Sequence, residues 1–355
     1  MKRQGNLFEK VYDIENIKLA ICMAAKGKRS RKNVQTVLDN LDYFAMKLQE
    51  MLMNREYEPT ISKTKEIYCI TQKKSRCVVV PDFYPDLCIQ WALILQLEPI
   101  IQKGMYYYSC GSLPNKGIHF AKRHIEKWLT KDRRNTKYCL QLDIKKYFNS
   151  INCGFLKNMF RKKIKDANML WLIDTIIDCQ DKGVPMGYFT STWFANFFLQ
   201  ELDHYIKEKL GIVYYVRYVD DMVLFGRNKK ELHKARKLIA EFLKNIGLEL
   251  KSNWQVYRVD KRAVDFLGYR YFRGYTLLRK SLALRIKRKV KRISKMKNPP
   301  YKNAAGIMSY LGWTKHCNAY NYYNKNIKPY LDMVKLKEVI RNESRKQQQT
   351  FCLSN

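Results

Sequence analysis

Hydrophobic positions recur at helical spacing along much of the chain. Apolar side chains three and four residues apart predict amphipathic helices, because such positions share one helix face. The last of these runs ends at Gly247, a residue typical of helix C-caps. The predicted helices cover residues 14–25, 34–52, 82–97, 155–179, 190–210 and 229–246.

Short runs with β-strand character separate these helices. The first two are joined by the basic segment 71–76, which predicts a hairpin. Asp143 lies near the end of the third run, and Asp220 and Asp221 lie between the last two, as at the tip of a hairpin. The predicted strands cover residues 67–70, 77–80, 138–144, 212–218 and 222–226, and short strands follow through residue 272.

The C-terminal part of the chain has a different pattern. Residues 279–297 carry ten Lys and Arg and no acid, with Leu282, Ile286, Val290 and Ile293 at helical spacing. This predicts a helix with one buried stripe and one cationic face. A charged run is usually a solvated face, but the absence of any compensating acid favours contact with a phosphate backbone.

The whole chain is strongly basic, with 68 Lys and Arg against 32 Asp and Glu and a formal net charge of +36. Self-repulsion at this charge lowers stability, so we expect a polyanionic partner: nucleic acid or an anionic membrane. The longest apolar stretch, residues 88–101, is interrupted by Gln90, Gln96 and Glu98 and is shorter than the roughly 20 residues of a membrane span. We therefore expect nucleic acid and no membrane.

Cysteine usage indicates the compartment. The ten cysteines are dispersed, and no two of them have Cys-x-x-Cys spacing, which fits a reduced environment better than disulfides or a zinc site. The first residues contain no apolar signal segment. We expect a cytoplasmic protein.

Three aspartates are the candidates for catalysis. Asp143 ends one apolar strand, and Asp220 and Asp221 are adjacent between two others. Two close carboxylates repel each other, and a divalent cation offsets that cost. Two Mg²⁺ ions roughly 3.5–4 Å apart could hold the attacking and leaving oxygens of a phosphoryl transfer. An Asp-Asp pair alone is more often an ordinary turn.

The order of motifs carries more weight than the pair, because it resembles reverse transcriptases over nearly the whole chain. Residues 143–148 resemble their motif A, residues 183–203 motif B, residues 218–221 (Tyr-Val-Asp-Asp) motif C and residues 266–270 the motif E primer grip. Two fingers blocks are similar to residues 76–90 and 108–117. The resemblance implies an RNA-directed DNA polymerase of the α+β class, with the right-hand fold of fingers, antiparallel palm and helical thumb.

The resemblance also implies roles for individual residues. Asp143, Asp220 and Asp221 would be catalytic and would bind two Mg²⁺ ions, or Mn²⁺ instead, with the Ile144 carbonyl as a further ligand. Phe148 would be the aromatic gate that excludes a 2′-hydroxyl; a core aromatic is the alternative. Nucleotide binding would involve Arg76, with Lys74 and Lys73 as weaker candidates; a solvated hairpin tip is the alternative for these three. The other nucleotide-binding assignments are Phe148, Met186, Gly187, Ser191 and Asn196. The remaining assignments are the primer grip Phe266, Leu267 and Gly268, and nucleic-acid contacts from Arg279, Lys280, Arg285, Lys287, Lys289 and Arg292.

The domain layout follows from the motifs. Residues 1–136 would form an N-terminal extension and fingers, and 137–275 the palm, with finger helices inserted near 155–182. Residues 276–355 would form a basic, helical thumb. Partners implied are a structured template RNA, an RNA/DNA hybrid and deoxynucleoside triphosphates.

The details resemble the enzymes of diversity-generating retroelements, which are close to group II intron relatives. Met186 stands where many reverse transcriptases have glutamine, and a thioether cannot donate a hydrogen bond near the templating pair; a methionine filling a core gap is equally compatible. Trp254 stands at about the place of a motif D lysine. This resemblance implies a further partner, a small basic accessory protein that forms a multimer. The alternatives are a defence-associated bacterial reverse transcriptase that copies a dedicated non-coding RNA against phage, and a non-catalytic RNA-binding scaffold.

Overall fold

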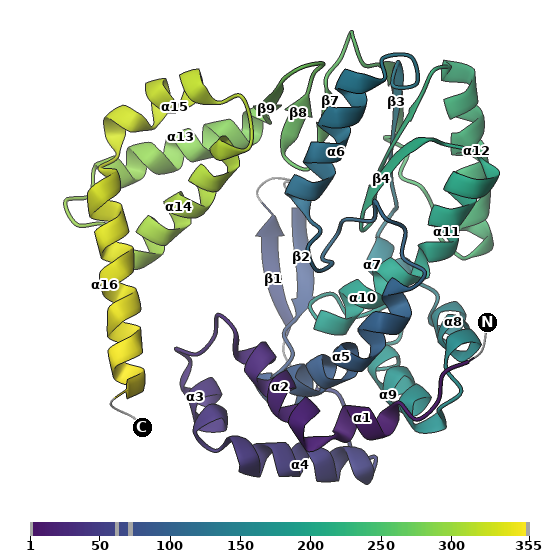
Figure 1. The fold of residues 1–355 in the computed structure, drawn as a ribbon, viewed down its shortest axis with the longest axis vertical. Coiled ribbons are helices and arrows are strands. Elements are labelled where there is room, and N and C mark those ends of the chain that lie inside the picture. Colours follow the sequence, from purple (N-terminus) through teal and green to yellow (C-terminus); the bar gives the residue numbers. More distant parts are fainter. Residues whose placement is uncertain (1–2, 61–63, 70–73, 353–355) are drawn as a thin grey trace. The chain divides into compact units, whose positions relative to one another are not determined.

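The computed structural model describes residues 3–60, 64–69 and 74–352. The chain forms two compact units (Figure 1). The first contains Met1–Ala121 and Tyr138–Val256, and the second contains Lys122–Lys137 and Tyr257–Asn355. Helices and antiparallel sheets together give an α+β fold, as predicted.

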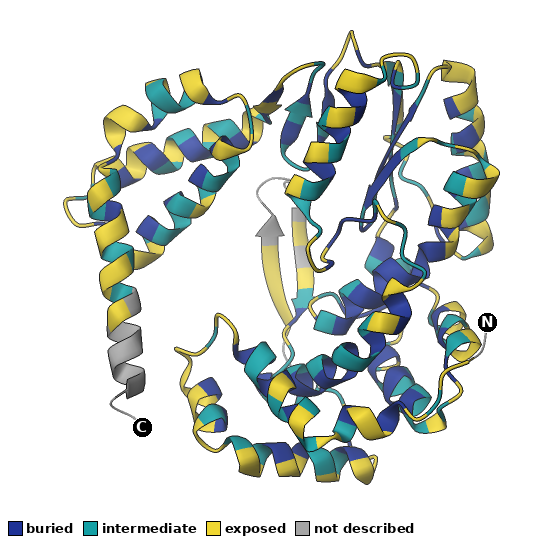
Figure 2. Cartoon of the chain, viewed as in Figure 1, coloured by how far each residue is buried: buried dark blue, intermediate teal, exposed yellow. Residues whose placement is uncertain are grey.

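A four-stranded sheet lies at the centre of the first unit, in the order β4-β5-β3-β6. The strand β5 is antiparallel to both β3 and β4, and helix α12 packs against β3 and β5. The inner residues of these strands are buried (Figure 2). The elements are β3 (Tyr138–Asp143), β4 (Tyr214–Tyr218), β5 (Asp221–Gly226), β6 (Gln255–Arg258) and α12 (Lys229–Asn245).

The N-terminal helices pack on one another within the same unit (Figure 1). Helix α2 packs against α4 and α5. The helix predicted over 34–52 is wrong, because the chain breaks at Asn40: its backbone leaves the helical region (φ −123°, ψ 44°) and its amide donates to the Thr36 carbonyl at 3.1 Å. The elements are α1 (Phe8–Tyr12), α2 (Ile14–Ala25), α3 (Lys32–Asp39), α4 (Leu41–Met53), β1 (Thr64–Cys69), β2 (Lys74–Val79), η1 (Phe83–Leu87) and α5 (Cys88–Gln102).

Two other predicted helices are also interrupted. The stretch 155–179 divides into two helices at residues 164–166, where Asp166 begins a new helix as its N-cap. The run 190–210 breaks at Leu199, whose backbone (φ −94°, ψ 6°) is not helical. The elements are α7 (Tyr147–Ser150), α8 (Cys153–Lys163), α9 (Ala167–Ile177), α10 (Phe189–Phe198), α11 (Gln200–His204) and η2 (Tyr205–Lys209).

The second unit combines a small antiparallel sheet, ordered β7-β8-β9, with helices. Helix α13 buries the predicted stripe of Leu282, Ile286, Val290 and Ile293. The elements are α6 (Ile118–Lys131), which begins in the first unit, β7 (Val264–Phe266), β8 (Tyr269–Tyr271), β9 (Thr276–Leu278), α13 (Lys280–Ser294), α14 (Tyr301–Lys315), α15 (Tyr320–Asn326), η3 (Lys328–Tyr330) and α16 (Met333–Cys352).

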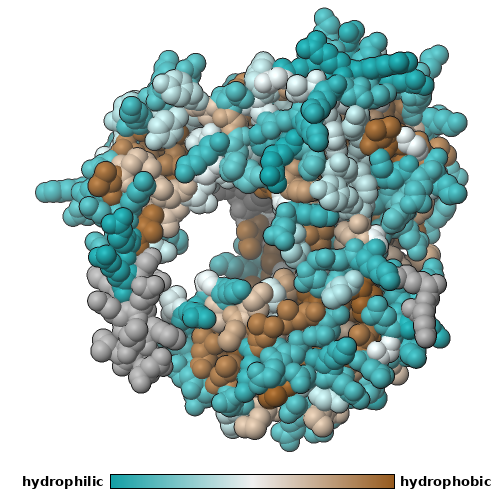
Figure 3. Space-filling view, in the orientation of Figure 1, coloured by the Kyte–Doolittle hydropathy of each residue, from teal (hydrophilic) through white to brown (hydrophobic). Residues whose placement is uncertain are grey.

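Hydrophilic residues dominate the face shown in Figure 3, in keeping with the high charge. Among the described residues, no helix has the length and apolar content to cross a membrane.

Candidate active site

The four-stranded sheet brings two of the three aspartates directly opposite each other. Asp143, the last residue of β3, pairs in register with Asp221, the first residue of β5. Side chains that are directly opposite in an antiparallel pair project from the same face, with Cβ atoms about 4.5–5.5 Å apart. Asp220 precedes Asp221 in the two-residue turn between β4 and β5. The predicted hairpin with acids at its tip is therefore confirmed.

Lys251, which the sequence did not single out, binds one of these carboxylates. Its ammonium group forms an ion pair with Oδ2 of Asp143. A short antiparallel contact positions the lysine, because its N–H donates to the Asp143 carbonyl at 2.8 Å and Ile144 pairs with Leu250. Trp254, which stands near the expected lysine of motif D, instead stacks under the Arg236 guanidinium, 4.4 Å from the ring centre.

The aspartates are chemically suited to hold a cation. Oδ1 of Asp143 is buried and has no hydrogen-bond partner among the described residues, so a carboxylate oxygen is available beside Asp221. Hard oxygen donors of this kind suit Mg²⁺. Among the described residues, however, no three Asp, Glu, His or Cys side chains already converge on one point.

The Ile144 carbonyl is not used by the contact that positions Lys251. The two hydrogen bonds that flank the Ile144–Leu250 pair use the Asp143 carbonyl and the Lys145 N–H. The geometry is therefore compatible with the predicted ligand role of Ile144, which stays a prediction.

Phe148 is fixed by the motif B loop. The Val184 N–H donates to the Phe148 carbonyl at 2.9 Å. At Gly183, where φ is +70°, an added Cβ would lie only 2.1 Å from the same carbonyl oxygen. Glycine is therefore required for the loop to approach the backbone of the predicted gate this closely.

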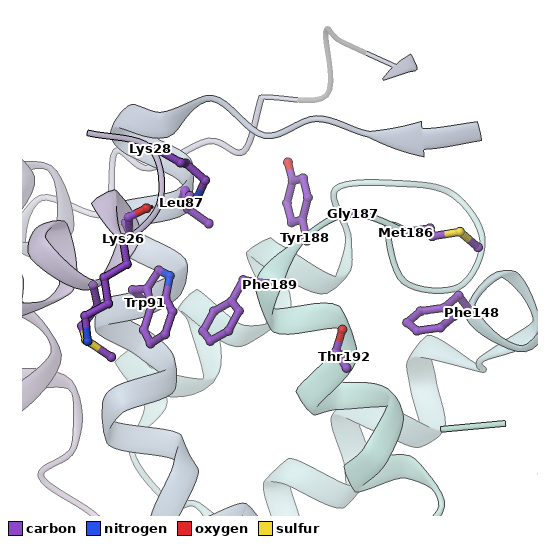
Figure 4. A pocket seen from close by; sticks show the side chains of 12 residues that line it. Lys26, Lys28, Leu87, Trp91, Phe148, Met186, Gly187, Tyr188, Phe189 and Thr192 are labelled. Carbon is purple, nitrogen blue, oxygen red and sulfur yellow. Dashed lines mark hydrogen bonds between the residues drawn. The ribbon is translucent and has the colours of Figure 1, made fainter. Parts of the chain in front are cut away.

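A cavity of about 470 Å³ opens beside Phe148 (Figure 4). Phe148 and Met186 lie at one end, and Lys26 and Lys28 lie at the other. The rings of Trp91 and Phe189 stack between them at 4.0 Å. Burial, and then the nearby Arg31, lower the pKa of Lys28. The lining residues are Met23, Ala24, Lys26, Lys28, Leu87, Trp91, Phe148, Met186, Gly187, Tyr188, Phe189 and Thr192.

The strand β2 contacts the same loop. The Val79 N–H donates to the Met186 carbonyl at 2.7 Å, and a Cβ on Gly187 (φ +122°) would lie 2.0 Å from the Val79 oxygen. Lys74 and Arg76 lie on β2, but their side chains are outside the described part of the structure, as is the whole of Lys73.

Two predicted nucleotide-binding residues are buried instead of lining the cavity. Asn196 donates to the Gly111 carbonyl at 2.7 Å and accepts from Arg217 at 3.1 Å. Ser191 is 1% exposed, and its hydroxyl has no hydrogen-bond partner in the part of the chain that the structure describes. Of the motif B candidates, Met186 and Gly187 line the cavity.

Comparison with known proteins identifies the family. Residues 61–271, more than half of the chain, match the model for reverse transcriptase (RNA-dependent DNA polymerase). The chain belongs to the reverse transcriptase family. The predicted RNA-directed DNA polymerase domain is thus confirmed at the level of the family.

Individual relatives of this reverse transcriptase are distant. It is 23% identical to protein YkfC of Escherichia coli K12 over 66% of this chain and 71% of that protein. It is 29% identical to the retron Ec73 reverse transcriptase of Escherichia coli over 35% of this chain and 43% of that protein. The group II intron-encoded protein LtrA of Lactococcus lactis is 27% identical over 45% of this chain and 28% of its own length.

Solved structures give a loose likeness of fold. A telomerase from Candida albicans, in complex with a fragment of telomeric RNA, is 13% identical with a TM-score of 0.48, over 85% of this chain and 60% of that chain.

The residues predicted as the primer grip of this reverse transcriptase form a tight turn between β7 and β8. Leu267 (φ +49°) and Gly268 (φ +83°) are both left-handed, and Phe266 is 4% exposed. A Cβ on Gly268 would lie 2.8 Å from the Trp313 ring. Their contact with a primer stays a prediction.

The predicted nucleic-acid contacts of α13 differ in exposure. Arg279 forms an ion pair with Asp265 at 2.6 Å, and the Lys289 ammonium lies 5.2 Å from the centre of the Tyr310 ring. Lys280 and Arg292 are exposed, whereas Arg285 and Lys287 are half-buried.

Proposed function

We propose that the protein synthesises DNA on an RNA template. The observation that carries the proposal is the register of Asp143 opposite Asp221. The cavity lined by Phe148 and Met186 is a second supporting feature. Membership of the reverse transcriptase family supports the proposal. The substrates would be template RNA, an RNA/DNA hybrid and deoxynucleoside triphosphates.

Asp143, Asp220 and Asp221, with the Ile144 carbonyl, would hold two divalent cations, Mg²⁺ or Mn²⁺. Bound there, such ions lower the pKa of a primer 3′-hydroxyl and stabilise the leaving pyrophosphate. Phe148 would pack under the sugar and exclude a 2′-hydroxyl. Lys26 and Lys28, at the far end of the cavity, would attract phosphate groups.

We assign residues 1–136 to an N-terminal extension and fingers, and 137–275 to the palm. The finger helices α8 and α9 are inserted within the palm segment. The thumb would be 276–355, with α13 contacting the backbone of the hybrid and Phe266, Leu267 and Gly268 the primer. An A-form hybrid presents shape and phosphate, which basic side chains can bind without base specificity.

For the biological role we propose error-prone copying in a diversity-generating retroelement. Met186 lines the cavity and cannot donate a hydrogen bond to a templating pair, which supports low fidelity. A small basic accessory protein would be the further partner. Defence against phage is the second candidate, because the similar proteins include the retron Ec73 and Ec86 reverse transcriptases.

The test is to sequence DNA made in cells that carry the protein with its native flanking locus. The blank is the double variant Asp220→Asn/Asp221→Asn, and Asp181→Asn, in an exposed loop, is the matched control. We expect DNA from the native protein and the control but none from the blank, because the catalytic acids are lost. Template RNA binding by the blank should persist.

Three outcomes distinguish the candidates. DNA copied from a neighbouring repeat, with changes at template adenines, supports diversity generation. Faithful or repetitive DNA from a separate structured RNA supports defence. DNA from the blank equal to that of the native protein would disprove the assignment of the acids and favour an RNA-binding scaffold.

A further inference from the structure

The turn that carries Asp220 and Asp221 is strained at Val219. Its φ is +57°, in the left-handed region, and it is the first of two residues that connect β4 to β5. Glycine is preferred at such a hairpin position, and a β-branched residue there is an outlier. Something else in the protein must therefore hold the turn in this conformation.

Arg217, two residues earlier on β4, contacts the strained residue directly. Its Nη1 donates to the Val219 carbonyl at 3.0 Å and to Oδ1 of Asn196 at 3.1 Å. The side chain is 0% exposed, so water does not compete for these hydrogen bonds. The arginine thus joins the turn to the interior of the unit.

Asp203 of α11 fixes the other edge of the guanidinium. Its Oδ1 accepts from Nε at 2.8 Å and its Oδ2 accepts from Nη2 at 2.6 Å, a bidentate pair that is 0% exposed on both sides. Burial alone lowers the pKa of Arg217, but Asp203 outweighs burial and the pKa is raised overall. Tyr215 also donates to Oδ1 of Asp203, at 2.7 Å, without touching the turn.

Gly111 closes the opposite side of the turn. A Cβ there would lie 2.5 Å from Cγ2 of Val219 and 2.7 Å from its nitrogen. The Gly111 carbonyl in turn accepts from the Asn196 amide at 2.7 Å. Val219 is therefore held between the arginine and a close backbone segment.

We propose that Arg217, fixed by Asp203 and Asn196, is a positioning residue that holds Val219 in its left-handed conformation and thereby places Asp220 and Asp221 for catalysis. This inference rests on the proposed polymerase function. The strain at Val219, which the buried arginine restrains, can also be measured through protein stability, without an activity assay.

The first test is a rescue experiment. Arg217→Lys keeps the charge next to Asp203 but removes the donor to Val219, so kcat for dTTP on poly(rA)·oligo(dT) should fall by roughly tenfold to a hundredfold. KM for dTTP and the Kd for the template should change little. Adding Val219→Gly should restore kcat to near that of Val219→Gly alone, because glycine adopts the conformation without help.

Tyr215→Phe is the matched control. It removes one hydrogen bond from the same buried Asp203 but none from the turn, so its kcat should match that of the native protein. Unchanged kcat in Arg217→Lys, or no recovery in the double variant, would overturn the proposal. A loss of kcat in Tyr215→Phe as large as in Arg217→Lys would also overturn it, because the effect would then be general to the core.

A second measurement tests the strain at Val219 even where the Arg217→Lys protein does not fold or the native protein makes no DNA. Val219→Gly should have a higher Tm than Val219→Ala, because both remove the branched side chain and only glycine removes the strain. A Tm for Val219→Gly equal to or below that of Val219→Ala would disprove the strain. A native protein without polymerase activity would instead disprove the proposed function and leave this measurement valid.

Discussion

Lys251 competes with any cation for an oxygen of Asp143. We predict that Lys251→Met increases the affinity for Mn²⁺, because the ion no longer has to displace an ammonium group. The change should be roughly tenfold, since a unit charge a few ångströms away contributes on the order of 1–4 kcal/mol in partly exposed surroundings. Electron paramagnetic resonance of Mn²⁺ without nucleic acid measures it.

The control for this prediction is Lys145→Met. Lys145 forms a similar but exposed ion pair with Glu249, at 3.0 Å, on the same stretch of backbone. Its loss should leave the Mn²⁺ affinity within about twofold, because exposed pairs are screened by water. Equal effects of the two variants would mean that only the overall charge matters.

At the scale of residues, the sequence identified the residues that belong to recognisable motifs. It missed residues that are distant in the sequence and reach the site only through folding. Asp143, Asp220 and Asp221 could be chosen because Asp143 lies near the end of a recognisable strand and the other two lie between two recognisable strands. Lys251 contacts Asp143 across more than a hundred residues of chain, through a bridge that no local pattern shows. Asn196 was assigned to nucleotide binding by its place in motif B, yet it is buried beside Arg217.

At the scale of elements, Gly187 allows β2 to dock on the motif B loop. We predict that Gly187→Ala lowers stability by roughly 2–4 kcal/mol and disturbs nucleotide binding, because the methyl group would overlap the Val79 oxygen.

Gly27→Ala is the matched control. Gly27 also has a positive φ (+72°) but has no atom within 4 Å of the added methyl, so its cost should be about 1 kcal/mol. Urea unfolding measures both; equal losses would contradict the steric argument.

Asp166 joins the N-terminal segment to α9. Its carboxylate accepts from Leu7 and Phe8 at 2.7 and 2.9 Å, and from two N–H groups of the helix at 3.1 Å. Partial burial alone raises the pKa of Asp166, but these four donors outweigh it and the pKa is lowered. The stabilisation is therefore complete above about pH 4, the unfolded value, and is lost as the pH falls through the folded pKa.

We predict that Asp166→Ala lowers stability by about 2 kcal/mol at pH 7, and that this difference from the native protein shrinks as the pH falls below 4. Asp13→Ala, which removes an ordinary N-cap with two donors on α2, should cost about 1 kcal/mol. Thermal unfolding at pH 7, 5 and 3 measures both. An Asp166→Ala deficit that persists undiminished at pH 3 would contradict the role of the charge.

The helix boundaries show where periodicity is informative and where it is not. The stripe on α13 was predicted residue for residue, because a strongly amphipathic pattern leaves one face to bury. The breaks at Asn40 and Leu199 were missed, because apolar spacing continues across them while the backbone turns. The strand β9 was missed as well, since three residues give no alternation to detect.

At the scale of the whole molecule, the net charge of +36 raises the question whether polyanion binding is general or local. We predict that Arg285→Ala/Lys287→Ala/Arg292→Ala weakens binding to an RNA/DNA hybrid. The slope of log affinity against log salt concentration should become shallower, by the amount expected for the loss of about two to three phosphate contacts. Lys289 is left intact because it packs over Tyr310. Fluorescence anisotropy over a range of salt concentrations measures the slope.

The matched control removes three exposed lysines of α12, as Lys230→Ala/Lys234→Ala/Lys237→Ala, and so changes the net charge equally. Its slope should stay close to that of the native protein. If the salt dependence becomes shallower by the same amount in both triple variants, the positive charge attracts the hybrid without a defined contact, and α13 is not a specific binding surface.

The hydrogen bond from the Val79 N–H to the Met186 carbonyl has a consequence for the proposed copying of RNA. It joins β2, the strand that carries Arg76, to the cavity wall at Met186, so a shift of either one strains the contact between them. If the protein copies RNA as proposed, mutations on the β1–β2 hairpin should alter copying errors as well as mutations in the cavity. Substitutions in this hairpin could therefore change the accuracy of such an enzyme during evolution without any change in the aspartates.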